Sequence, residues 1–165
     1  GDQVCLARLG AAHDINLSGW TLHDFRLMCI LSGCDYLPSI EGMGIKTAHR
    51  LVLTEKTIDR ILRRIRLQGK FHVPKGYAEK VVDAQLTFQH QRVYDIGTRR
   101  LTFLHDLPSS KSLADSMEFL GPDLTPELAQ GIAEARINPI TLQAFDAAPD
   151  QEPNPTESPP VKPAA

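Results

Sequence analysis

The stretch "LSGCDYLPSIEGMGIKTAHRLV", Leu31–Val52, joins an apolar run to a glycine-spaced turn and then to a basic helix start. Asp35 stands at the end of the apolar run. Gly42-Met43-Gly44, here called the glycine loop, comes just before the helix start at Ile45. Apolar residues at helical spacing on both sides of this turn predict two helices joined by a polar loop.

The glycine loop has the composition of a phosphate-binding turn. Backbone N–H groups at a helix start point outward, and the helix dipole favours a phosphate oxygen there. Glycine permits a positive φ and carries no Cβ that would hold a phosphate away from the amides. Lys46 and Arg50 add positive charge beside this seat. A plain helix–turn–helix corner of the core is the alternative explanation of the same G-x-G spacing.

Four helices are predicted along the first part of the chain. Thr21 and Asp24 have the pattern of a capping box at the start of the first helix, and Gly33 ends it. The next three helices start near Ile45, near Thr57 and after Pro74. The predicted buried positions are Ile45, Ala48 and Val52 on the helix that starts near Ile45. They are Ile58, Ile61, Leu62 and Ile65 on the next helix, and Tyr77, Val81, Ala84 and Phe88 on the helix after Pro74.

A later helix is marked by Thr125 as its cap and Pro126 in its first turn. Its apolar positions are Leu128, Ile132 and Ala135, and a last short helix is predicted over 139–146.

The remaining segments are a hairpin and a tail. The residues "RVYDIGTRRLTFL", 92–104, allow one short β-hairpin. Residues 147–165 hold proline, acidic and small residues and only one larger apolar side chain, Val161, so we expect a disordered Pro-rich tail. The predicted fold class is therefore mainly α.

Composition limits the classes of protein. Hydrophobic residues make up 42% of the chain, and no run approaches the roughly 18 apolar residues of a membrane-spanning helix. Cys5, Cys29 and Cys34 include no C-x-x-C pair, which fits a reduced compartment, with Cys29 and Cys34 as small buried hydrophobes. Because the chain begins with Gly1 rather than Met, we expect it to be part of a longer protein.

Charge is unevenly distributed along the chain. Residues 41–100 contain 13 Lys and Arg against 6 Asp and Glu, a net charge of +7, whereas the whole chain has a net charge of −2. A basic middle segment favours a polyanionic partner, and a solvated helix face is the alternative.

One long block, "FRLMCILSGCDYLPSIEGMGIKTAHRLV", resembles the eukaryotic exonuclease-one proteins of the XPG and flap endonuclease superfamily of 5′ nucleases. The resemblance extends more loosely through the rest of the chain except the tail. It implies that residues 1–146 are the helical C-terminal part of a 5′-nuclease (PIN-like) domain. Within that part, a helix–two-turn–helix element at about 22–53 would bind duplex DNA.

The resemblance also implies a set of DNA-binding and potassium-binding residues. The implied K⁺ ligands are the Ser32 carbonyl, the Ser39 hydroxyl and the Met43 carbonyl, although Ser39 as an ordinary turn serine is the alternative. The implied phosphate contacts come from Gly42, Gly44, Lys46 and Arg50. Arg63 and Arg64 on the next helix are further candidates for phosphate contacts, with a solvated face as the alternative.

Asp35 matches the last metal-binding aspartate of that superfamily, in the block "SGCDY". Cleavage by such nucleases uses two Mg²⁺ ions about 4 Å apart, which need carboxylates from several segments. The other ligands belong to the N-terminal half of the nuclease domain, so this chain alone is expected to bind DNA weakly without cutting it. An ordinary turn aspartate is the alternative for Asp35.

The function expected from the resemblance is that of a structure-specific 5′→3′ double-stranded DNA exonuclease or flap endonuclease of DNA repair and replication in the nucleus. Its partners would be duplex DNA with a 5′ end, nick or flap, and repair or replication proteins bound by the tail. Binding to a membrane is not expected. One alternative is a non-catalytic helix–hairpin–helix DNA-binding module. The other is an interaction protein whose basic middle docks an acidic partner.

Aromatic and histidine side chains near the glycine loop are candidate nucleic-acid contacts. Trp20 and Tyr36 each adjoin an apolar helix, which favours a place in the core over base stacking. His49 lies beside the predicted phosphate seat, so contact with DNA is a hypothesis for this side chain.

Overall fold

The computed structural model describes residues 5–12, 14–108 and 117–145. These residues form two compact units. The first runs to Val93 and resumes from Leu101 to Asp123, and the second combines Tyr94–Arg100 with the segment that starts at Leu124. The predicted tail, 147–165, lies outside the described residues, so its disorder and the boundary near residue 146 stay predictions.

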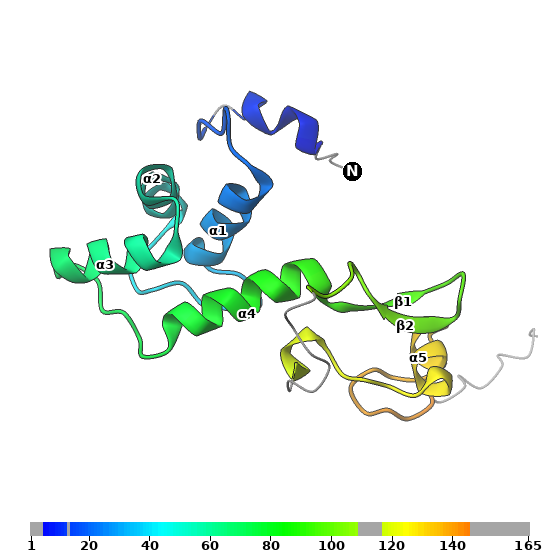
Figure 1. Ribbon diagram of the computed structural model, residues 1–165. Helices are drawn as coiled ribbons and strands as arrows, with labels where there is room; N and C mark the ends of the chain where they lie inside the picture. The colour runs from blue at the N-terminus through cyan, green and yellow to red at the C-terminus, as the bar shows by residue number, and fades with distance from the viewer. Residues whose placement is uncertain (1–4, 13, 109–116, 146–165) are drawn as a thin grey trace, which may run out of the picture. The chain divides into compact units, whose positions relative to one another are not determined.

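Helices make up most of the first unit (Figure 1). They are the 3₁₀ helix η1 (Leu6–Ala11), α1 (Leu22–Ser32), α2 (Ile45–Glu55), α3 (Ile58–Gln68), α4 (Tyr77–His90) and the 3₁₀ helix η2 (Glu118–Leu120). The strands β1 (Arg92–Asp95) and β2 (Arg100–Phe103) pair as a hairpin, and α5 (Pro126–Ala133) belongs to the second unit. The prediction of a mainly α fold with one short hairpin is confirmed.

The start and end of α1 follow from its local sequence. The Thr21 hydroxyl accepts a hydrogen bond from the Asp24 N–H at 3.1 Å, and the Asp24 carboxylate accepts one from the Thr21 N–H at 3.2 Å. This reciprocal capping box satisfies two N–H groups at the helix start. Gly33 ends the helix with a φ of +100°, a conformation that a residue with a side chain rarely adopts.

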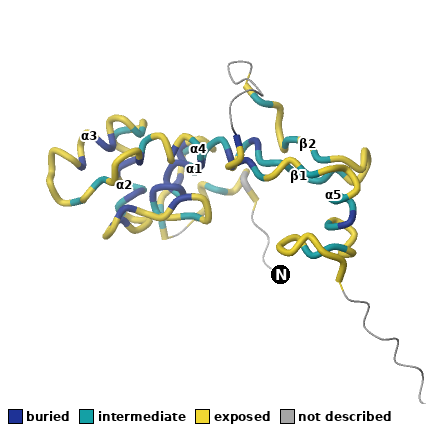
Figure 2. Tube along the Cα trace, turned by 90° about the horizontal axis from the view of Figure 1, so that it is seen from below, coloured by how far each residue is buried: buried dark blue, intermediate teal, exposed yellow. Residues whose placement is uncertain are grey.

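The core of the first unit lies among α1, α2, α3 and α4 (Figure 2). Its fully buried side chains include Ile30, Leu31, Ala48, Val52, Ile61, Ile65 and Val81. The predicted buried positions on α3 and α4 are confirmed at Ile61, Leu62, Ile65, Tyr77, Val81 and Ala84. Ile58 is half-buried against the same core.

Two predicted core positions are wrong. Ile45 is 46% exposed, because it is the first residue of α2 and lies where the preceding loop opens to solvent. Phe88 is 36% exposed, because its ring meets the edge of the Tyr36 ring rather than the interior of the helix bundle.

The second unit departs from the sequence prediction near its end. Thr125 caps α5 by accepting a hydrogen bond from the Leu128 N–H, as predicted, but α5 ends at Ala133 and Ala135 lies beyond it with a φ of +55°. The short helix predicted over 139–146 is absent from its described residues, 139–145. The Asn138 side chain instead accepts hydrogen bonds from two following N–H groups, and Ile137 bridges Ala144. An Asn that bonds its own following backbone favours a turn over a helix.

Within the described ranges, no helix has the length and apolar character needed to cross a membrane.

Candidate nucleic-acid interface

The connection between α1 and α2, residues 33–44, is folded tightly against itself. A Cβ placed on Gly33 would stand 3.3 Å from the Ser39 backbone nitrogen and 3.4 Å from the Ser39 Cβ. Further on, the Met43 N–H donates to the Ile40 carbonyl at 2.9 Å, which closes a four-residue turn with Gly42 at a φ of +78°. Ile40 and Met43 are buried and anchor this turn in the core, so the two glycines of the glycine loop face solvent.

Gly42 and Gly44 are needed for different reasons. Only Gly42 has a positive φ, whereas Gly44 is extended, with φ −92° and ψ 176°. The expectation that positive φ explains both glycines is therefore corrected for Gly44. A Cβ on Gly44 would meet nothing within 4 Å, so this position is open to an approaching molecule.

Gly44 is the N-cap of α2, and no side chain caps this helix start. The Gly44 carbonyl accepts hydrogen bonds from the N–H groups of Thr47 and Ala48, each at 3.0 Å. Among the described residues, no acceptor is recorded for the N–H groups of Gly44, Ile45 and Lys46. The first turn of α2 also lacks an acidic side chain. This helix start therefore presents unpaired donors and the positive end of the helix dipole to solvent.

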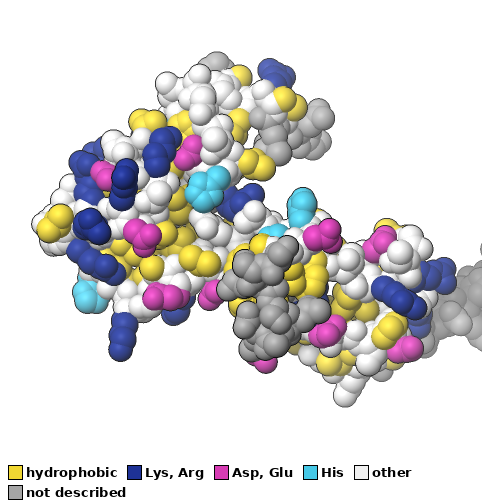
Figure 3. Space-filling model, in the orientation of Figure 1, with side chains coloured by type: hydrophobic (Ala, Val, Ile, Leu, Met, Phe, Trp, Pro, Cys, Tyr) yellow, Lys and Arg dark blue, Asp and Glu magenta, His cyan; other side chains and the backbone are white. Residues whose placement is uncertain are grey.

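Basic side chains surround this helix start and continue along the next helix. Figure 3 shows Lys and Arg side chains gathered over α2 and α3. The exposed basic residues of these two helices and the link between them are Lys46, Arg50, Lys56, Arg60, Arg63, Arg64 and Arg66. A density of this kind gives the face a positive potential that attracts phosphates.

The arginines of α3 are not equivalent. Arg60, Arg63 and Arg64 line one shallow hollow with Glu55 at the end of α2. Arg64 forms an ion pair with Glu55, whereas no ion pair is recorded for Arg63 within the described part of the chain. Arg63 therefore keeps its full charge available to a phosphate.

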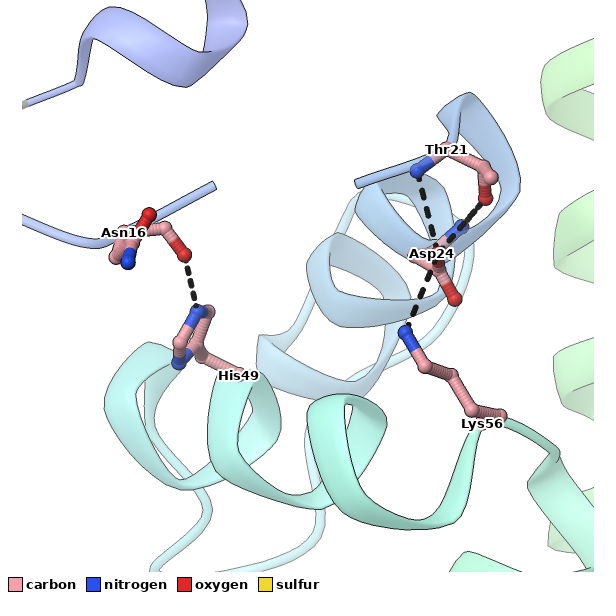
Figure 4. Close-up of polar contacts among 5 residues, drawn as sticks. All are labelled: Asn16, Thr21, Asp24, His49 and Lys56. Atoms are coloured by element: carbon pink, nitrogen blue, oxygen red, sulfur yellow. Dashed lines mark hydrogen bonds and ion pairs between the residues drawn. The ribbon is translucent and has the colours of Figure 1, made fainter. Parts of the chain in front are cut away.

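Several contacts fix α2 to α1 and to the segment that precedes α1, and Figure 4 shows the polar ones. The His49 ring stacks on Trp20 with 4.6 Å between ring centroids, and its Nε2 donates to the Asn16 carbonyl at 2.9 Å. Lys56, just after α2, lies 3.6 Å from the Asp24 carboxylate of α1. These contacts hold the orientation of α2, and hence of its open N-terminus, relative to α1.

The environment of Asp24 shifts its pKa. Burial by itself raises the pKa of this carboxyl, but hydrogen bonds from Thr21 and the Lys56 ammonium together outweigh burial, so the pKa is lowered. Asp24 is therefore a charged partner of Lys56 as well as a helix cap.

Asp35 lies at the tip of a two-residue turn in the same connection. Cys34 and Leu37 pair as a single β-bridge, and Asp35 and Tyr36 between them are exposed. Tyr36 is 42% exposed, so the expectation that it belongs to the core is wrong, whereas Trp20 is half-buried against the core as expected.

Cys29 and Cys34 are also half-buried against the core. Burial, together with the nearby Cys34, raises the pKa of the Cys29 thiol.

No family model matches the chain. It is 39% identical over 146 residues to an exonuclease 1 of Oryza sativa subsp. japonica, covering 88% of this chain. It is also 39% identical over 147 residues to an exonuclease 1 of Arabidopsis thaliana, covering 89% of this chain. A flap endonuclease 1 of Entamoeba histolytica is 37% identical over 84 residues, or 51% of this chain. The chain is a segment of the exonuclease 1 and flap endonuclease family. The sequence-based resemblance is thereby confirmed.

This family segment spans only part of its relatives. The match covers 17% of the Oryza protein, 20% of the Arabidopsis protein and 21% of the Entamoeba protein. The chain therefore corresponds to about a fifth of the length of these relatives.

The predicted potassium ligands of this family segment are brought together in part. The close approach of Gly33 to Ser39 places the Ser32–Gly33 peptide beside the Ser39 side chain. The Ser32 hydroxyl donates to the Cys29 carbonyl, and no hydrogen-bond donor to the Ser32 carbonyl is recorded in the described chain. Met43 lies in the turn closed on Ile40, and no hydrogen bond between Met43 and Ser39 is recorded among the described residues.

The predicted magnesium ligand is a single carboxylate. Within the described residues, no three His, Cys, Asp or Glu side chains lie close enough together to hold a metal ion. Asp35 is exposed and fits one ligand of a metal site, and a complete site needs carboxylates from outside the described residues.

Sequence reasoning missed the contacts that hold the site in place. The Tyr36 hydroxyl donates to the Gln91 side chain at 3.0 Å, and the Tyr77 hydroxyl reaches the Pro38 carbonyl at 3.5 Å. The partner residues are far apart along the chain, so local patterns carry no signal for these pairs.

Proposed function

We propose that this chain binds the double-stranded part of a DNA substrate through a phosphate at the glycine loop. The observation that carries this proposal is the open N-terminus of α2, where Gly44 has no side chain and the N–H groups of Ile45 and Lys46 have no recorded acceptor among the described residues. Lys46 and Arg50 supply positive charge beside these donors. Helix N-termini with this combination bind anions.

Binding of this kind depends on the shape and charge of the DNA rather than its sequence. Backbone N–H groups and lysine or arginine side chains contact phosphates, and phosphates do not distinguish bases. Arg63 and Arg64 on α3 extend the basic surface, so a second phosphate contact is proposed there. The expected ligand is duplex DNA with a 5′ end, nick or flap.

A potassium ion is proposed in the connection between α1 and α2. The Ser32 carbonyl, the Ser39 hydroxyl and the Met43 carbonyl would hold it. Oxygen donors of this type suit a hard cation. When bound, the ion adds positive charge beside the glycine loop, which favours a DNA phosphate there. The proximity of Gly33 and Ser39 supports this assignment for the first two ligands.

The longer protein is proposed to be a 5′→3′ double-stranded DNA exonuclease or flap endonuclease that works in DNA repair and replication in the nucleus. The identity of the relatives as exonuclease 1 and flap endonuclease 1 proteins supports this proposal. Asp35 would be one ligand of a two-ion Mg²⁺ site, which supplies the activation of water and the stabilisation of the leaving oxygen. This chain alone would bind DNA without cutting it, because one carboxylate cannot hold two ions. The tail would bind repair or replication proteins.

A salt titration tests the DNA-binding proposal. Affinity of the chain for a duplex with a recessed end is measured by fluorescence anisotropy between 50 and 300 mM salt. Each neutralised phosphate should contribute about 0.9 to the negative slope of log affinity against log salt. A slope near zero contradicts the glycine-loop proposal and favours an interaction protein.

The second candidate function is a non-catalytic helix–hairpin–helix DNA-binding module. In this candidate Asp35, which is exposed at the tip of its turn, is an ordinary turn aspartate. Substitution D35A in the longer protein separates the two candidates. Loss of cleavage with retained DNA affinity supports the nuclease, whereas an unmodified longer protein that binds DNA without cleaving it supports the binding module.

A further inference from the structure

The backbone that carries Asp35 is fixed at both ends of its turn. The Cys34 N–H donates to the Leu37 carbonyl at 3.0 Å, and the Leu37 N–H donates to the Cys34 carbonyl at 3.2 Å. Leu37 is 3% exposed and belongs to the core. The turn therefore has a rigid base, but Asp35 and Tyr36 at its tip project away from that base.

Tyr36 ties the tip of the turn to α4. Its hydroxyl donates to the side-chain oxygen of Gln91 at 3.0 Å. Gln91 is the residue that immediately follows the last residue of α4. Its ring also packs edge to face against Phe88, with 4.9 Å between centroids and 78° between ring planes. An exposed tyrosine with a hydrogen bond at one end and an aromatic contact along its ring has few alternative rotamers.

A second tyrosine ties the other end of the same segment to the same helix face. The Tyr77 hydroxyl reaches the Pro38 carbonyl at 3.5 Å. Tyr77, Phe88 and Gln91 are separated by 11 and 3 residues, which places them on one face of a helix. Residues 36–38 and α4 also enclose a common hollow, lined on the helix side by Lys80, Asp83, Ala84 and Thr87.

We propose that Tyr36 is a positioning residue, which Gln91 holds in place so that the neighbouring Asp35 carboxylate keeps one orientation. This inference rests on the proposed metal-binding role of Asp35. A metal ligand on a fixed turn binds with less loss of conformational freedom than one on a mobile turn, and the residues behind a ligand commonly set its orientation. Apart from the bond to Gln91 and the contact with the Phe88 ring, no anchor of the turn tip is recorded within the described residues.

The test compares four variants in the longer protein that contains this chain. Y36F and Q91L each remove the hydrogen bond, and Q91E keeps an acceptor for the Tyr36 hydroxyl. Q89L is the matched control, since Gln89 is a glutamine on α4 whose side-chain amide has one recorded acceptor in the described chain, the Gln85 carbonyl of its own helix. Cleavage of a 5′-flapped duplex gives kcat and KM at several Mg²⁺ concentrations.

Y36F and Q91L should lower kcat about tenfold, because a small displacement of a reacting group can lower the rate up to about a hundredfold. Both substitutions should also raise the half-saturating Mg²⁺ concentration. The KM for DNA should be unchanged. Q91E and Q89L should match the unmodified protein. Without metal, amide hydrogen exchange at Cys34 and Leu37 should be faster in Y36F and Q91L than in Q89L.

Two results overturn the proposal. One is kcat and amide exchange in Y36F and Q91L that match Q89L. The other is a loss of kcat in Q91E as large as in Q91L, because a retained acceptor should restore the anchor. The substitution D35A distinguishes this failure from that of the proposed function. If D35A is fully active, the metal role of Asp35 is wrong, whereas an inactive D35A with unaffected Y36F and Q91L rejects only the positioning role.

Discussion

Gly33 and Ser39 approach so closely that a Cβ on Gly33 would stand 3.3 Å from the Ser39 backbone nitrogen. This contact folds the connection after α1 back on itself and brings the Ser32–Gly33 peptide beside the Ser39 side chain. The geometry of the proposed potassium site therefore depends on a glycine that the metal itself does not contact.

Substitution G33A should destabilise the chain by about 1–3 kcal/mol, because alanine is strained at a φ of +100° and its Cβ crowds Ser39. G69A is the matched control, since Gly69 also has a positive φ, +62°, but a Cβ there meets nothing within 4 Å. Urea unfolding measures both variants. An equal loss of stability in G33A and G69A would show that crowding against Ser39 is unimportant.

Substitution G44V should weaken DNA affinity with little change in stability. Gly44 has an extended backbone and open space around its Cβ position, so valine fits the fold, but its methyl groups obstruct the amides of the α2 N-terminus. The expected stability cost is at most about 1 kcal/mol, from the poorer N-cap. Anisotropy titration with duplex DNA and thermal unfolding are measured on the same sample. Unchanged affinity would reject the phosphate seat.

Substitution R63Q should reduce the salt slope of DNA binding by about 0.9, the value for one phosphate contact. R136Q is the control, because Arg136 is an exposed arginine of the second unit that is paired with Glu134. A slope for R63Q equal to that for R136Q would mean that the arginines of α3 form a solvated face only.

Asp24 makes stability depend on pH at the acid end. Its pKa in the folded chain is below the ordinary value of 3.8, so its contribution to stability is present above about pH 3.8 and is lost as pH falls through the lowered pKa. D24N should therefore be less stable than the unmodified chain at pH 6, and the difference should narrow as pH falls below 3.8. Urea midpoints across this range measure the effect. If the stability difference between D24N and the unmodified chain stays the same below pH 3.8, the negative charge of Asp24 does not contribute to stability.

His49 tests whether a residue beside the phosphate seat is a DNA contact or a support. H49A should cost about 1–3 kcal/mol of stability, from the lost stack on Trp20 and the lost hydrogen bond to Asn16. H49F keeps the stack and should recover part of this loss. DNA affinity at temperatures well below unfolding should be the same in both variants. A lower affinity of H49F would instead support direct contact with DNA.

Local patterns were sufficient to predict helices α1 to α5. The Thr21 and Asp24 capping box, the apolar stripe of α3 and the Thr125 cap all act within a few residues, so their outcome is present in the sequence. The prediction of a helix over 139–146 is wrong because the Asn138 side chain accepts hydrogen bonds from the backbone N–H groups that follow it, which stabilises a turn in place of a helix.

The candidate site was predictable only in part. The glycine loop and its basic neighbours are contiguous in sequence, and the structure keeps them together and exposed. The stacking of His49 on Trp20 and the bond from Tyr36 to Gln91 join residues 29 and 55 positions apart. Such pairs form only after helices have packed, so the spacing of residues does not report them.

The sequence by itself determined the helices, their caps, the basic middle of the chain and the family to which the segment belongs, because propensity, capping and similarity act through short or directly aligned stretches. The tertiary structure alone decided that Gly33 meets Ser39, that Gly42 and Gly44 serve different purposes, and that Tyr36 lies on α4 rather than in the core. The physical reason is that packing selects among side-chain positions that the local sequence leaves equally accessible.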